Sequence, residues 1–171
     1  MRDRILGAAT AVLVQRGLNG WTVDEVARKA ACAKGLVNYH YRSKQQLLER
    51  IAELLREERW AKRLTAANEP KPLDRLWQTL IGEVGSGRFA AWLSLLVAGE
   101  KLRHAARTPS QHAESLCRSL GESLDLGDQL ARHGALVAAA LDGLAIRLLE
   151  GADPSTLEEV YHRFWLALLD M

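Results

Sequence analysis

The sequence has few of the residues that would point to a secreted, disulfide-rich or membrane-bound protein. Its two cysteines, Cys32 and Cys117, are too few for a disulfide framework, and both lie within apolar patterns. The longest nearly apolar stretch, Phe89 to Gly99, includes Ser94 and is far shorter than the ~20 residues of a membrane-spanning helix. The N-terminal residues lack the apolar core of a signal peptide. We therefore expect a cytoplasmic protein without a membrane segment.

Signs of β-structure are also scarce. β-branched residues are sparse, and no useful length of sequence alternates with the period of two that a strand requires. Ala, Leu, Arg, Glu and Gln dominate, and these residues favour helices. The sequence therefore predicts an all-α fold. Nine helices are expected, at 2–16, from Thr22 onward, and at 33–39, 43–67, 73–84, 88–107, 109–124, 127–149 and 155–169.

The net charge of +2 is unevenly distributed along the chain. Residues 1–63 hold 13 Lys and Arg against seven Asp and Glu, whereas the remaining residues hold 10 against 14. This asymmetry suits a head that approaches a polyanion and a body that does not. A solvated face on one long helix across residues 50–63 would give a similar imbalance, so charge alone leaves both interpretations open.

The segment from Thr22 to Lys44 has the pattern of a helix-turn-helix. Thr22 followed by Glu25 has the spacing of a capping box, and small and apolar residues follow at the offsets that two crossing helices need. In this motif the second helix enters the major groove, where Asn38 can pair with an adenine edge and Lys34 can reach guanine or a phosphate. The residues expected to contact DNA are Thr22, Lys34, Gly35, Leu36, Asn38, Tyr39, His40 and Lys44.

This segment resembles the TetR family of bacterial transcriptional regulators. The resemblance rests on Lys34-Gly35 at the start of the recognition helix, the cluster Tyr39-His40-Tyr41, Ser43-Lys44 and the Leu47-Leu48 pair. It covers the chain closely from its first residue to about residue 55.

The resemblance implies a division of the chain into two domains with different roles. Residues 1–46 would form a three-helix DNA-binding head, and residues 47–171 a helical bundle for ligand binding and dimerisation. It also implies a homodimer that binds palindromic operator DNA and represses transcription. An unidentified small molecule would be its effector, and no cofactor is implied.

Three positions depart from the family pattern. Ala31 replaces the glycine of the turn, so a left-handed conformation there would cost about 1–2 kcal/mol. Ala33 replaces the serine that caps the recognition helix, a cap that contributes roughly 1 kcal/mol. Asn38 stands where the family has tyrosine, which suggests a base preference of its own.

The last two expected helices carry apolar faces that are broad enough for a partner subunit. Apolar residues recur there at intervals of three and four, as in helices that pack lengthwise. We expect two helices from each chain to form a four-helix interface, although these faces could also meet within one subunit. The interface residues expected are Leu130, Gly134, Val137, Leu141, Leu144, Leu148, Leu157, Tyr161, Phe164, Trp165 and Leu168.

A ligand site is expected in the body, where apolar side chains are mixed with a few polar groups. The candidate lining residues are Trp77, Trp92, Leu96, His104, His112, Cys117 and Asp142. The histidines show no metal-ligand spacing and no nucleophile motif is present, so neither a metal site nor an enzyme is expected. An activator of the same fold, or a helical binding protein with a vestigial helix-turn-helix, remain the alternatives.

Overall fold

The computed structural model describes residues 1–170, which form ten α-helices and one 3-10 helix and contain no strand. The predicted all-α fold is therefore confirmed. The packing divides the chain into two compact units, one made of residues 1–58 and 87–107 and the other of residues 59–86 and 108 onward. The expected split into domains 1–46 and 47–171 concerns function rather than packing, and it stays a prediction.

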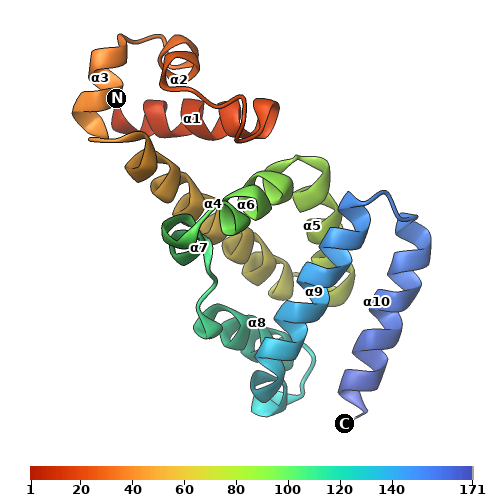
Figure 1. The fold of residues 1–171 in the computed structure, drawn as a ribbon. Helices are drawn as coiled ribbons and strands as arrows, with labels where there is room; N and C mark the ends of the chain where they lie inside the picture. Colours follow the sequence, from red (N-terminus) through yellow and green to blue (C-terminus); the bar gives the residue numbers. More distant parts are fainter. Residues whose placement is uncertain (171) are drawn as a thin grey trace. The chain divides into compact units, whose positions relative to one another are not determined.

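The first unit contains the helix-turn-helix. Its elements are α1 (Arg2–Arg16), α2 (Val23–Lys29), α3 (Lys34–His40), the N-terminal part of α4 (Lys44–Ala67), α6 (Arg88–Val97) and α7 (Glu100–Ala106) (Figure 1). The apolar face of α1, with Ile5, Ala9 and Leu13, is buried, and α1 ends at Gly17 with a left-handed φ of 66°. Arg56 of α4 donates hydrogen bonds to the carbonyl oxygens of Ala105 and Arg107, which fastens the end of α7 to α4.

The second unit contains the rest of the chain. Its elements are the C-terminal part of α4, α5 (Pro72–Gly85), α8 (Ser110–Ser123), the 3-10 helix η1 (Gly127–His133), α9 (Gly134–Leu149) and α10 (Pro154–Leu169). The helices α9 and α10 lie side by side, and both contact α5 (Figure 1). Trp77 and Tyr161 stack with ring centroids 5.2 Å apart, and the Tyr161 hydroxyl donates to the carbonyl oxygen of Leu73 at 2.8 Å.

Two of the expected helices are each divided. The segment 88–107 breaks at Ala98 and Gly99 into α6 and α7, and the segment 127–149 begins as a 3-10 turn before α9. A very close backbone approach lies next to this turn, because a Cβ atom at Gly121 would lie 2.0 Å from the carbonyl oxygen of Gly127. Only glycine fits there.

No single helix within residues 1–170 is long and apolar enough to cross a membrane. The helices α5 and α6 pass such a test only when they are taken together, and they are separated by a break at Ser86 and Gly87.

Candidate functional site

The helix-turn-helix joins one capped helix to one uncapped helix. The Thr22 hydroxyl accepts a hydrogen bond from the Glu25 amide at 3.2 Å, so Thr22 is the predicted N-cap of α2. Ala31 has a left-handed φ of 46°, the conformation in which a Cβ atom is strained. Ala33 precedes α3 in an extended conformation and makes no side-chain cap hydrogen bond. Both departures from the family pattern therefore have the local cost expected of them.

The side chains expected to contact DNA remain accessible in the first unit. Val37, on the opposite side of α3, is 1% exposed, which fixes α3 on the core. Tyr39 is 80% exposed, and its ring lies edge-on to that of His40 at 5.3 Å. The exposed residues are Thr22, Lys34, Gly35, Asn38, Tyr39 and Lys44, while Leu36 and His40 are half-buried.

Lys44 is held in place by a tryptophan that the sequence reasoning did not single out. Its ammonium lies 5.5 Å from the centroid of the Trp21 ring and donates to the Trp21 carbonyl oxygen at 3.3 Å. The indole N–H of Trp21 in turn donates to the carbonyl oxygen of Ala9 at 2.9 Å. Trp21 is 1% exposed, so it forms a rigid support between α1 and the start of α4.

Acidic side chains accompany the basic ones on α2. The Lys34 ammonium lies 2.9 Å from the Asp24 carboxylate, and both side chains are exposed. Glu25 pairs with Arg28 and with Arg16, and the hydrogen bond from Arg28 holds the pKa of Glu25 below its ordinary value. The sequence analysis missed the pairs of Asp24 with Lys34 and of Glu25 with Arg16, because a pair between two helices depends on how the helices cross.

Comparison with known proteins identifies this arrangement. The model of the family described as bacterial regulatory proteins, tetR family, matches residues 5–51, the segment that holds the helix-turn-helix. The helix-turn-helix of this chain is that of the TetR family. Relatives of the family are named as transcriptional regulators, which confirms the predicted class and the expectation that this chain is not an enzyme.

Similar proteins extend the match beyond the DNA-binding segment. The transcriptional regulator BetI of Paraburkholderia phymatum is 26% identical over 90% of this chain and 83% of its own length. The probable acrEF/envCD operon repressor of Escherichia coli is 26% identical over 93% of this chain and 60% of its own length. The crystal structure of the multidrug binding protein EbrR with imidazole matches at a TM-score of 0.63, 26% identity, 95% of this chain and 93% of that chain.

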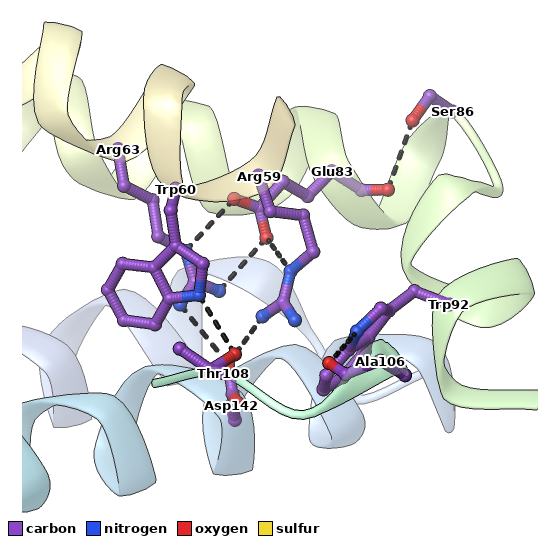
Figure 2. Close-up of polar contacts among 9 residues, drawn as sticks. All are labelled: Arg59, Trp60, Arg63, Glu83, Ser86, Trp92, Ala106, Thr108 and Asp142. Carbon is purple, nitrogen blue, oxygen red and sulfur yellow. Dashed lines mark hydrogen bonds and ion pairs between the residues drawn. The ribbon is translucent and has the colours of Figure 1, made fainter. Parts of the chain in front are cut away.

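The second unit contains a cluster of four charged side chains (Figure 2). Arg59 and Arg63, one turn apart on α4, are 3% and 0% exposed and share Glu83 of α5 at 2.9–3.3 Å. Asp142 of α9 lies 2.5 Å from Arg59 and 3.1 Å from Arg63. Two positive and two negative charges thus compensate each other. Burial still lowers the pKa of Arg59 from its ordinary value.

The structure gives several of the seven candidate ligand residues other contacts. Asp142 belongs to the charged cluster, and the Trp92 indole donates to the carbonyl oxygen of Ala106 at 3.0 Å (Figure 2). Burial raises the pKa of the Cys117 thiol to about 11. Three of the seven, Trp92, Leu96 and His104, lie in the first unit, and Trp77, His112, Cys117 and Asp142 lie in the second. Neither unit gathers the whole set.

Each unit has an open cleft that the sequence analysis did not foresee. In the first unit a cleft of about 500 Å³ lies between α4 and α7, and His104 is one of its lining residues together with Glu49, Glu53 and Glu100. In the second unit a cleft of about 530 Å³ lies between α4 and α5, over Thr65 and its neighbours. Both fall within the size range of small-molecule sites, although their walls are more polar than is usual.

A dimer interface through the last two helices stays a prediction. Most of the residues expected there are buried within the second unit: Leu130, Gly134, Val137, Leu141, Leu144, Leu157, Tyr161, Trp165 and Leu168, with Leu148 and Phe164 half-buried. The periodic apolar stripe lies on the inner faces of α9 and α10, since α9 packs on α5 and α8 and α10 packs on α5 and α9. The apolar side chains left on the outer surface are Leu136, Ile146 and Leu149 of α9 and Val160 and Leu166 of α10, at 38–64% exposure.

Proposed function

We propose that this chain is a homodimeric repressor, which binds palindromic operator DNA and leaves it when a small molecule binds. The observation that carries the proposal is the exposed set of polar side chains on α3 and at the start of α4, within the segment that matches the family model. Residues 1–46 would bind DNA and residues 47–171 would bind the effector and the second subunit. Such a regulator would act in the cytoplasm, where the DNA is.

Similar proteins support the role of a repressor and the presence of an effector. One relative is named as a probable operon repressor, and one structural neighbour is named as a multidrug binding protein. We propose an effector site in the body, with Trp77, Trp92, Leu96, His104, His112, Cys117 and Asp142 as candidate contacts. The helix α4 contributes residues to both packing units, so a ligand that favours one arrangement of α4 would alter DNA binding.

The outer surface of α9 and α10 supports the dimer. Five large apolar side chains are exposed on these two neighbouring helices, and exposed apolar surface of this kind marks interaction sites. A two-fold axis would bring two helices from each chain together and set the recognition helices ~34–36 Å apart. Ile146→Glu and Leu166→Glu should therefore yield monomers in sedimentation velocity, whereas Leu64→Glu, an equally exposed leucine on α4, should not.

DNA binding is tested by fluorescence anisotropy with duplexes from upstream of the chain's own coding region. Lys44→Ala should flatten the plot of log affinity against log salt by roughly 0.9, because one phosphate contact is lost. Lys62→Ala, a matched exposed lysine of the second unit, should leave the slope unchanged. Asn38→Ala should instead change the ranking of operator variants.

Three results would contradict parts of this proposal. No salt-dependent binding by the wild-type chain would favour the helical binding protein with a vestigial helix-turn-helix. An equal loss from Asn38→Ala at every site would remove its role in reading bases. A reporter gene that becomes more active when the chain is expressed would replace the repressor with an activator.

A further inference from the structure

Lys34, the first residue of the recognition helix, already forms an ion pair with a carboxylate of the same chain. Its ammonium lies 2.9 Å from a carboxylate oxygen of Asp24, which stands in the first turn of α2. The side chains are 55% and 70% exposed, so the pair lies on the surface, where DNA would have to approach. A carboxylate at hydrogen-bonding distance takes the place that a phosphate oxygen would take.

The pair can be opened, because exposed ion pairs are held weakly against solvent and salt. A phosphate can therefore compete with Asp24 for the ammonium. As long as Lys34 stays with Asp24, the two charges cancel and Lys34 neutralises no phosphate. When Lys34 moves to a phosphate, the Asp24 carboxylate is left unpaired beside the DNA and repels it.

We propose that Asp24 is a built-in competitor for Lys34, which lowers the affinity of the chain for DNA of any sequence. The inference rests on the proposed function, in which α3 enters the major groove. Beyond that function, it assigns a role to Asp24, which contacts no base and sets the non-specific affinity through its ion pair with Lys34. Lower non-specific affinity leaves more of the protein free for its operator.

The size of the effect follows from counterion release. One additional phosphate contact steepens the salt dependence by about 0.9 in the log–log slope. If the electrostatic contribution vanishes near 1 M salt, this slope corresponds to about a fivefold gain in affinity at 0.15 M. Asp24→Asn, which keeps the size of the side chain and removes its charge, should therefore raise the affinity for a random-sequence duplex about fivefold.

A matched control separates competition for Lys34 from a plain change of charge. Glu25→Gln removes one negative charge from the same turn of α2, but its partners are Arg16 and Arg28. It should change the affinity much less than Asp24→Asn does. The second control is the Lys34→Gln background, in which Asp24 has no ammonium to hold, so the gain from Asp24→Asn should disappear.

The experiment measures the anisotropy of a labelled random duplex from low to high potassium chloride, with circular dichroism to show that every variant is folded. A fivefold gain that needs Lys34 and exceeds the effect of Glu25→Gln supports the proposal. An unchanged affinity of Asp24→Asn overturns it, as does a gain that persists in the Lys34→Gln background. A wild-type chain that binds no duplex would overturn the proposed function itself, which is a different result.

Discussion

Replacing Glu83 by glutamine should destabilise the second unit strongly. Glu83 is 4% exposed and accepts hydrogen bonds from both Arg59 and Arg63. The amide keeps the shape of the side chain and removes its charge, so two buried guanidinium groups lose the counter-charge that they share and keep that of Asp142. Removing one partner from a buried ion pair typically costs about 3–5 kcal/mol.

This cost corresponds to a large shift in thermal stability. For a chain of this size, each kcal/mol lowers the unfolding midpoint by about 2–4 °C, so Glu83→Gln should lower it by about 6–20 °C in far-ultraviolet circular dichroism. The matched control is Glu69→Gln. Glu69 pairs with Arg75 at 3.2 Å, but these side chains are 45% and 59% exposed. The loss of such a surface pair should cost no more than about 1 kcal/mol.

The comparison of the two variants decides whether burial is the cause. If Glu83→Gln and Glu69→Gln lower the midpoint by similar amounts, the reasoning from burial is refuted. Asp142→Asn gives an additional check, because its carboxylate is 29% exposed and water can replace part of what is lost. Its effect should fall between those of the other two variants.

Three further predictions concern backbone strain, thiol chemistry and close packing. Ala31→Gly should stabilise the chain by about 1 kcal/mol in urea unfolding, because glycine adopts the left-handed conformation without strain, and a loss of stability would contradict this. In the native protein at about pH 8, a thiol reagent should modify the half-buried Cys32 well before the fully buried Cys117, whose pKa of about 11 keeps it protonated; equal rates would refute this. Gly121→Ala should unfold far more readily than the wild type, whereas Gly143→Ala, with open space around it, should be neutral or stabilising, and similar midpoints would disprove the steric argument.

Local signals in the sequence were sufficient for most of the helix boundaries. Gly17, Thr22 and Ser43 act on their own neighbours: Gly17 ends α1, while Thr22 and Ser43 each accept a hydrogen bond from an amide three residues ahead. Such contacts depend on a few consecutive residues, which sequence reasoning sees directly. The break at Gly99 was missed, because a single glycine within a helical pattern does not by itself end a helix.

Long-range arrangements were much harder to predict. On α9 the periodic stripe from Val137 to Leu144 was recognised, but the opposite face is also apolar, with Leu136 and Ile146. Periodicity shows that a face is buried and not which neighbour buries it, so the stripe alone does not distinguish packing within one subunit from packing against a second. The charged cluster was missed for a related reason, since only the one-turn spacing of Arg59 and Arg63 is visible in the sequence.

The support beneath Lys44 has an optical consequence. Trp21 is the one tryptophan in residues 1–46, and a cation lies over its ring. A phosphate that draws this cation away would change the electric field at the indole and with it the wavelength of emission. With the other four tryptophans replaced by phenylalanine, the protein would carry its own fluorophore at the proposed DNA contact, and binding could be followed without any attached label.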